Sequence, residues 1–464
     1  MVFSSISFLY VFLPIVLALY FLVPRCLKNY VLLAGSLFFY FVGEPIYVIL
    51  LLISSVSDYF HSIYIERRRG TTAAKAALVS SILINLAMLG FFKYADFFIG
   101  SVNDLLGTTI PLTGVELPIG ISFFAFQTMS YTIDVYRGKA HAEKNLATFA
   151  TFVCLFPQLI AGPIVRYTDI SQELRSRKHT LDHLYLGIRR FVFGLAKKVL
   201  IADAMGRLCD IFRDSEASVV FYWLYAVAVS LQIYFDFSGY SDMAIGLGRI
   251  FGFSFPENFD YPFVSGSITE FWRRWHMTLG GWFRDYLYIP LGGNRVGKLR
   301  WVVNIAIVWA ATGLWHGAAW TFILWGLMFG ILLILEKLFL LKLLKKAGAF
   351  VRHFYVLVLI ALSFVLFSAA DMSQLVSDFK GLFGSVPLWS ADTGYYLGSY
   401  AVLLIVALIG ATPICKRLWN RFAETKCGKM FGNFAEPLAV CLLLAASTAY
   451  LVDGSFSPFL YFRF

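Results

Sequence analysis

Apolar segments long enough to cross a bilayer recur from one end of this chain to the other, separated by short polar connections. A transmembrane helix needs about 20 predominantly apolar residues, whereas barrel strands show alternating segments of about ten. The pattern therefore predicts an all-α polytopic membrane protein with ten to twelve transmembrane helices. The candidate spans are Ser7–Val23, Tyr30–Phe60 (broken near Gly43), Ala73–Phe92, Ile119–Val135, Leu146–Ala161, Leu184–Ile201, Val219–Phe237, Trp301–Leu335, Tyr355–Ala370, Tyr395–Thr412 and Leu438–Leu451.

The segment Trp301–Leu335 is too long for one ordinary crossing. Its 35 residues include no Asp, Glu, Lys or Arg, and its one titratable side chain is His316. A straight helix of that length would measure about 52 Å against a hydrocarbon core of about 30 Å. Gly313 and Gly317 bracket His316 and predict a break there. Backbone groups freed at that depth need protein or water partners, which favours a cavity around His316. The alternative is a histidine bonded to a neighbouring carbonyl in a packed bundle.

Composition agrees with this class and leaves no room for a separate soluble domain. The 464 residues are 59% hydrophobic and 14% charged, well below the quarter that is usual in soluble domains, and the mean hydropathy is +0.72. We therefore expect residues 1–464 to form a single integral-membrane domain, with the first apolar segment retained as a helix. Six cysteines are scattered without metal-ligand spacing, so we interpret them as small buried hydrophobes and expect no metal site.

The net charge of +11 comes from basic clusters that separate the apolar spans. Anionic lipid headgroups account for such clusters, so we expect membrane lipids and no nucleic acid among the partners. Arg25 and Lys28 follow the first span, and basic residues at 416–429 precede the last one. Because basic loops tend to face the cytoplasm, both chain ends are predicted to face outward.

Two apolar stretches hold unusual polar side chains. Pro118–Gly138 contains Gln127 among other polar residues, and Leu231–Phe259 contains Asp236 and Asp242. Residues six apart point about 120° away from each other on a regular helix, so the two aspartates are not expected to act as a paired acid and base. They either bind neighbouring helices or line a reaction path.

The segment 258–300 does not resemble a spanning helix, because Trp, Arg, His and Gly alternate along it. We interpret it as an interfacial or re-entrant segment, with Trp272 and Trp275 at headgroup depth and Arg273 and Arg274 reaching water or phosphate. A plain lipid anchor would explain this mixture about as well as a ligand site. The polar side chains Glu270, His276, Asp285 and Asn294 add more hydrogen-bonding chemistry than an anchor needs.

Two quoted motifs give the chain a family resemblance. "EFWRRWHMTLGGWFRDYLYIPLGGNR", followed about twenty residues later by "GLWHGAAWTFILWG", resembles the signature of the membrane-bound O-acyltransferases. Within that family the chain is most similar to the bacterial alginate O-acetyltransferase branch. The similarity extends to "MVFSSISFLYVFLPIVLALYFLVP", "PIGISFFAFQTMSYTIDVYRG", "FPQLIAGPIVRY", "FDFSGYSDMAIGLGRIFGFSFPENF" and the terminal "YFRF". One departure is Phe329 in "WGLMFG", where relatives often have a second histidine in "WGxxHG".

The resemblance implies a ring of helices around a central catalytic tunnel, with His316 of "LWHG" as the catalytic histidine. It implies acetyl-CoA as the cytoplasmic thioester donor and a hydroxyl acceptor on an exopolysaccharide such as alginate. A buried neutral imidazole suits a base that takes the hydroxyl proton. Under this interpretation, other residues have secondary roles: donor binding by Arg273, Arg274, Trp272 and Trp275; secondary catalysis by His276 or Asn294; and tunnel lining by Asp236, Asp242, Trp315 and Gln127.

The resemblance also implies a bacterial inner-membrane location and a separate outward-facing acetyltransferase of the SGNH-hydrolase type. Two other classes of function stay open. A D-alanyl transferase of the same superfamily would take its acyl group from a carrier-protein thioester for teichoic acid. A proton-coupled transporter would use Asp236, Asp242 and His316 as a relay and would need no "FWRRWH" segment.

Overall fold

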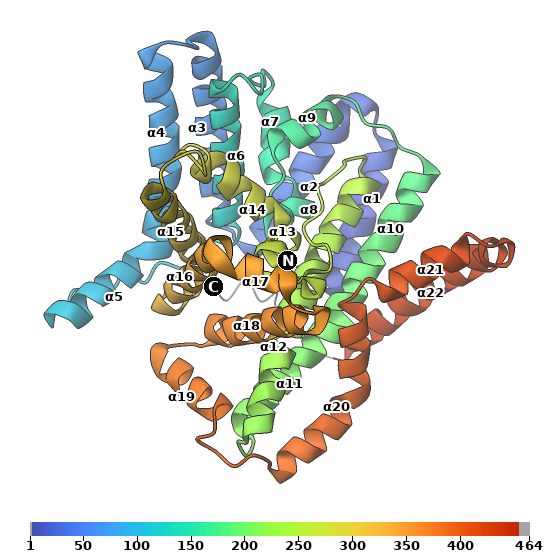
Figure 1. Cartoon of the computed structure of the whole chain (residues 1–464). Helices are drawn as coiled ribbons and strands as arrows, with labels where there is room; N and C mark the ends of the chain where they lie inside the picture. Colours follow the sequence, from blue (N-terminus) through green and yellow to red (C-terminus); the bar gives the residue numbers. More distant parts are fainter. Residues whose placement is uncertain (1, 454–464) are drawn as a thin grey trace. The chain divides into compact units, whose positions relative to one another are not determined.

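The computed structural model describes residues 2–453, which contain helices and connections and no β-strand. The terminal "YFRF" motif lies outside the described residues. The chain forms two compact units, one of Met1–Phe191 with Ser241–Pro256 and the other of Val192–Tyr240 with Glu257–Phe464. Their elements are labelled in Figure 1, and each unit is described by itself.

The first unit holds the helices of the amino-terminal part of the chain. Their bounds are α1 Leu13–Leu22, α2 Lys28–Gly43, α3 Val48–Arg67, α4 Thr72–Leu89, α5 Ala95–Leu106, α6 Ile121–Tyr136, α7 Leu146–Cys154, α8 Phe156–Leu159, α9 Tyr167–Arg175 and α10 Leu181–Ala196, which ends in the second unit. A polar network joins α3, α4 and α6: buried Asp58 accepts hydrogen bonds from Ser81 (2.6 Å) and Asn85 (2.8 Å), and Thr128 donates to Asn85 (3.1 Å).

The second unit begins within α10 and contains most of the remaining helices. They are α11 Asp203–Asp214, α12 Val219–Ile250 (shared with the first unit), α13 Ile268–Arg274, α14 Met277–Phe283, α15 Lys298–His316, α16 Trp320–Leu335, α17 Leu341–Lys346, α18 Ala349–Ser368, α19 Met372–Leu382, α20 Ala391–Gly410, α21 Ile414–Ala423 and α22 Lys426–Val452. Its core is dominated by aromatic and branched aliphatic side chains of α12, α13, α16 and α18. The segment 258–300 forms only short helices, as expected from its sequence.

Seven helices within the described residues are long and apolar enough to cross a membrane, and Phe8–Leu22 is a shorter apolar one. This confirms a polytopic helical membrane protein but not the count of ten to twelve. The expected span Leu146–Ala161 is wrong as one helix, because it divides into α7 and α8. Pro157 explains the division, since proline lacks an N–H and its ring clashes with the carbonyl four residues earlier.

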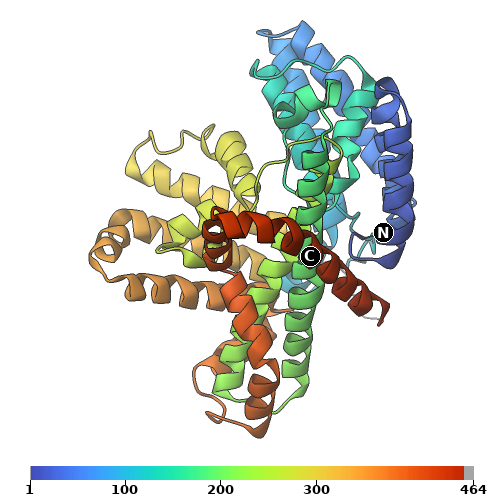
Figure 2. The ribbon, with the colours of Figure 1, turned by 90° about the vertical axis from the view of Figure 1, so that its right-hand side faces the viewer.

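The expected break in Trp301–Leu335 is confirmed. The helices α15 and α16 lie side by side in both views (Figures 1 and 2) and are joined by an extended connection after His316. Gly317 lies in that connection, whereas Gly313 lies inside α15 and serves packing instead. A Cβ on Gly313 would clash with the Phe322 carbonyl oxygen, and a Cβ on Gly326 would lie 3.1 Å from the Gly313 Cα. The two glycines thus let the helix backbones approach closely.

Candidate active site

His316 is the last residue of α15 and is only 3% exposed. The helix ends there because Gly317 and Ala319 are both extended, after which α16 begins at Trp320. The Phe322 ring occupies the space where a Cβ on residue 317 would lie, so only glycine allows this turn to pack. The local sequence therefore fixes an imidazole at the carboxyl end of a helix, where the helix dipole favours a positive charge.

Aromatic rings surround His316. The ring centroids of Trp315 and Trp325 each lie 5.0 Å from the imidazole, and the ring of Phe367 on α18 lies 5.4 Å away. All three contacts are edge-to-face, which is a favourable geometry for packed rings. These rings pack against the imidazole, which keeps only 3% of its surface exposed.

Phe329, which stands where relatives often have a second histidine, belongs to the same aromatic core. It is 1% exposed, and its ring lies 4.9 Å from that of Trp272 and 5.2 Å from that of Trp325. The position is therefore filled by packing in this chain. Any second polar group near His316 must come from another part of the sequence.

The ring of His276 is one such group, because its centroid lies 6.5 Å from that of His316 and 5.8 Å from that of Trp315. His276 is 1% exposed and joins α13 to α14 with a φ of 44°. A left-handed backbone at a residue other than glycine costs on the order of 1–3 kcal/mol and tends to occur at functional sites. Burial lowers the pKa of His276 to about 3, so the ring is neutral at physiological pH.

Asn258 fixes the tautomer of His276. Its Oδ1 accepts hydrogen bonds from the Thr278 backbone N–H (3.3 Å) and the Thr278 hydroxyl (2.9 Å). Because a backbone N–H can only donate, the Asn258 atom at this position must be the oxygen. The same oxygen lies 3.1 Å from Nδ1 of His276, so Nδ1 carries the hydrogen and donates it. Nε2 then holds a lone pair, is buried, and has no hydrogen-bond partner among residues 2–453.

Glu336 anchors the helix that leads to His276. This fully buried carboxylate accepts hydrogen bonds from the backbone N–H groups of Ile268 (2.7 Å) and Thr269 (2.8 Å) and from the Thr269 hydroxyl (2.6 Å). Backbone N–H groups in the first turn of a helix lack intrahelical partners, and a carboxylate there is stabilising. Glu336 follows the end of α16. It therefore ties α13 to the helix pair that presents His316.

The predicted donor-binding residues divide into exposed and packed ones. Arg273 is exposed, but Arg274 is bound by Glu270 (3.1 Å) and Asp260 (3.0 Å). Trp275 is 3% exposed and stacks on Phe271, unlike the headgroup position expected of an interfacial anchor. The ring of Trp272 lies 4.7 Å from that of Trp309. Of this group, Arg273 is the one placed to meet a soluble ligand.

The predicted tunnel-lining aspartates are both held by basic side chains. In the second unit, Asp236 lies 2.8 Å from Nζ of Lys198, which also contacts Asp203 at 2.6 Å. All three groups are buried. In the first unit, Asp242 accepts two hydrogen bonds from Arg190 at 2.9 and 3.0 Å. Both carboxylates therefore bind neighbouring elements, which was one of the two roles open from the sequence.

The remaining predicted residues lie on other elements than His316. Gln127 is buried on α6 in the first unit, and Asn294 is exposed on the turn before α15. The cysteines are only partly as expected, because Cys154 and Cys209 are buried and the other four are exposed. Cys26, Cys427 and Cys441 lie on apolar helices, where sequence hydropathy cannot separate outer faces from core faces, whereas Cys415 lies on the more polar α21.

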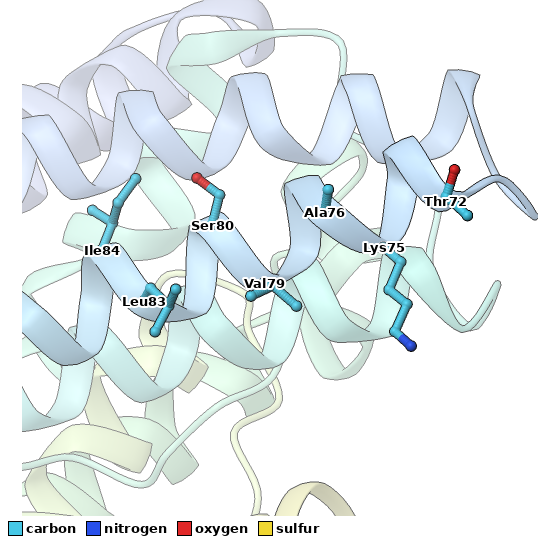
Figure 3. Close-up of a pocket in the computed structure, with 7 residues that line it drawn as sticks. All are labelled: Thr72, Lys75, Ala76, Val79, Ser80, Leu83 and Ile84. Carbon is cyan, nitrogen blue, oxygen red and sulfur yellow. The ribbon is translucent and has the colours of Figure 1, made fainter.

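A hollow on the first unit contains none of the predicted site residues. It runs along one face of α4, as Figure 3 shows, with Lys75 near its start and Leu83 and Ile84 at its other end. The histidine pair lies in the second unit. No residue of the histidine pair lines the hollow. Among the described residues, no group of three or more His, Cys, Asp or Glu side chains is placed to hold a metal ion.

Comparison with known proteins gives consistent matches. The sequence model of the membrane-bound O-acyltransferase family matches residues 75–373. The chain is 38% identical to a protein of Azotobacter vinelandii named "Probable alginate O-acetylase" and 32% identical to the peptidoglycan O-acetyltransferase of Helicobacter pylori. These matches cover all of this chain and 100% and 98% of the relatives. The teichoic acid D-alanyltransferase of Bacillus subtilis is 30% identical over 46% of this chain and 58% of its own length.

Proposed function

This chain belongs to the membrane-bound O-acyltransferase family, and we propose that it moves an acetyl group from cytoplasmic acetyl-CoA across the membrane to a polysaccharide hydroxyl. The relatives that match over the full length are named as O-acetylating enzymes, which favours an acetyl group over D-alanine. The observation that supports the proposal most is the pair of buried histidines, His316 and His276, with ring centroids 6.5 Å apart inside an aromatic core.

His316 acts as the general base in this proposal. The hydroxyl oxygen bonds to the thioester carbonyl carbon while its proton passes to the imidazole of His316. Collapse of the tetrahedral intermediate breaks the carbon–sulfur bond, and the imidazolium returns the proton to the leaving thiolate. The carboxyl end of α15 stabilises the imidazolium, because the helix dipole places partial negative charge there. The surrounding rings of Trp325 and Phe367 exclude water that would hydrolyse the thioester.

His276 orients the reacting groups through the lone pair on its Nε2. A neutral imidazole in this tautomer accepts a hydrogen bond, either from the acceptor hydroxyl or from the protonated His316. It cannot serve as a proton donor through Nε2 while Asn258 holds the hydrogen on Nδ1. The proposal thus assigns the base to His316 and an orienting role to His276. Asn294, exposed on its turn, has no place in this scheme.

Replacing Asn258 tests the tautomer. Asn258→Leu removes the oxygen that binds Nδ1 of His276, so we expect kcat to fall about 10- to 100-fold, the range for losing a buried hydrogen bond. Asn258→Asp keeps an acceptor oxygen and should retain more activity. Nitrogen NMR of labelled imidazoles reports the tautomer directly, without relying on activity. A wild-type tautomer and rate in Asn258→Leu would contradict the assignment.

The arginines of "FWRRWH" are expected to differ in function. Arg273→Gln should raise KM for acetyl-CoA several-fold, because an exposed ion pair contributes on the order of 1 kcal/mol to binding. It should leave KM for a short acetyl thioester unchanged. Arg274→Gln should instead lower stability, because Arg274 holds Glu270 and Asp260. Equal KM changes on both donors in Arg273→Gln would show that this residue does not bind the nucleotide.

The donor and acceptor are tested together by reconstituting the purified full chain in liposomes. Labelled acetyl-CoA is supplied on one side with alginate or peptidoglycan fragments on the other, and label in the saccharide is measured. Activity only with a carrier-bound D-alanyl thioester would favour the D-alanyl transferase. A transporter is disfavoured because Asp236 and Asp242 are held in ion pairs. We also propose a bacterial inner-membrane location and an outward-facing SGNH-type partner, which co-purification would test.

A further inference from the structure

Cations from two distant parts of the chain meet in the first unit. Arg25 lies in the short 3-10 helix Arg25–Leu27, and Lys28 begins α2 directly after it. Arg177 lies in the connection between α9 and α10. The charges of all three lower the pKa of the His179 imidazole, after the larger effect of burial. Neither Arg25, Lys28 nor Arg177 forms a salt bridge in the part of the chain that the structure describes. The cluster therefore has positive charge with no carboxylate to balance it.

Aromatic faces hold the two inner cations. Lys28 is 9% exposed, and its Nζ lies 4.3 Å from the ring centroid of Tyr20 and 5.1 Å from that of Phe21. The guanidinium carbon of Arg177 lies 4.6 Å from the ring centroid of Phe253 and 5.7 Å from that of Tyr20. The ring of Tyr20 is thus shared by an ammonium and a guanidinium. Cation–π contacts fix both groups but do not neutralise them.

Hydrogen bonds orient the guanidinium and leave part of it unused. Nη2 of Arg177 donates to Oδ1 of Asn29 at 2.6 Å. Nη1 is buried and has no hydrogen-bond partner among residues 2–453. A buried charged donor without a partner is costly, and a guanidinium edge suits the oxygens of a phosphate. The arrangement therefore favours an oxyanion as the missing partner.

The imidazole of His179 lies beside Tyr20 and is affected by the charges of the cluster. The Tyr20 hydroxyl donates to the carbonyl of Phe251 (2.8 Å), so it can only accept from Nε2 of His179 (2.9 Å). Burial lowers the pKa of His179, and the charges of Lys28, Arg177 and Arg25 lower it further. The cations thus act in the same direction as burial and favour the neutral form of this ring.

We propose that Lys28 and Arg177, with Arg25 at the rim, bind a phosphate group. Two sources offer this chemistry: the headgroup of an anionic phospholipid and a free phosphate-bearing molecule such as coenzyme A. The position favours the lipid, because Arg25–Gly43 is apolar enough to cross a membrane and its first residues then lie at headgroup depth. The site lies in a different unit from His316, and the proposal does not depend on the acetyl-transfer mechanism.

The test measures binding to the purified full chain in detergent. Wild type should bind phosphatidylglycerol more tightly than phosphatidylcholine, and the variant with Lys28→Met and Arg177→Gln should lose about tenfold or more in affinity. The matched control, Lys416→Met with Arg417→Gln, removes the same charge from α21 and should change affinity little. Equal losses in both pairs would reduce the effect to general surface charge and overturn the proposal.

Competition separates the two phosphate sources. Inorganic phosphate and coenzyme A are added as competitors at micromolar to low millimolar concentration. If one of them displaces phosphatidylglycerol from wild type and does not bind the Lys28→Met, Arg177→Gln variant, the site takes a soluble ligand. No displacement identifies the lipid headgroup. If the double variant fails to fold, Arg177→Lys is used instead, because it keeps the positive charge but removes the planar guanidinium. A several-fold loss of affinity for phosphatidylglycerol is then expected. The proposal would also be overturned if wild type bound phosphatidylglycerol no more tightly than phosphatidylcholine and bound no soluble phosphate.

Discussion

His316→Gln is expected to reduce acyl transfer at least about 10²-fold while the protein still folds and inserts. General-base catalysis is typically worth about 10²- to 10⁴-fold, and an amide cannot take the hydroxyl proton. Glutamine is chosen because His316 is packed between the rings of Trp325 and Phe367, so alanine would also leave a cavity. The rate of transfer from labelled acetyl-CoA to a saccharide in liposomes measures the effect.

A histidine outside the proposed site, His61, serves as the control for this change. His61 on α3 is hydrogen-bonded to the Ser57 carbonyl in the first unit and has no role in the proposed chemistry. His61→Gln should therefore retain nearly full activity. The same transfer rate in His316→Gln and wild type would rule out His316 as the base.

Lys198→Met is expected to destabilise the protein by about 3–5 kcal/mol, the range for removing one partner of a buried ion pair. Lys198 is the shared cation for Asp203 (2.6 Å) and Asp236 (2.8 Å), and all three side chains are less than a tenth exposed. Without the ammonium, two carboxylates remain buried next to each other. The free energy of unfolding from a denaturant titration in detergent measures the loss.

Two further variants show whether charge causes that loss. Lys75→Met removes an exposed lysine on α4 and should change stability by less than about 1 kcal/mol. Adding Asp236→Asn to Lys198→Met removes one of the two buried negative charges and should restore part of the stability. If the double variant is no more stable than Lys198→Met, packing rather than charge accounts for the effect.

The chain's apolar pattern was sufficient to predict the class of protein and most helices. The break after His316 followed from length, because 35 uncharged residues exceed one crossing and Gly317 offers the turn. The pattern was less informative where a single residue determines the end of a helix or the contact between two helices. Pro157 divides a span of good hydropathy, and Gly313 proved to be a packing position because the helix it contacts lies later in the chain.

The second histidine shows why the site itself was harder to predict. His276 and His316 are 40 positions apart, and no periodicity relates them, so only the fold brings their rings within 6.5 Å. The sequence also gave no indication of the roles of Asn258 and Glu336. An amide that binds a histidine, or a carboxylate that binds the start of a helix, stands at no fixed distance along the sequence from its partner. The family resemblance identified His316 through "LWHG" but did not indicate which side chains enclose it.

The most direct test of the account is a single-turnover measurement across a membrane. The full chain is reconstituted with labelled acetyl-CoA enclosed and a soluble saccharide outside, and label in the saccharide is followed for wild type, His316→Gln and His61→Gln. The account predicts transfer by wild type and by His61→Gln, and a loss of at least about 10²-fold in His316→Gln. Equal transfer by His316→Gln, or no transfer by wild type to any hydroxyl acceptor from acetyl-CoA, would contradict it.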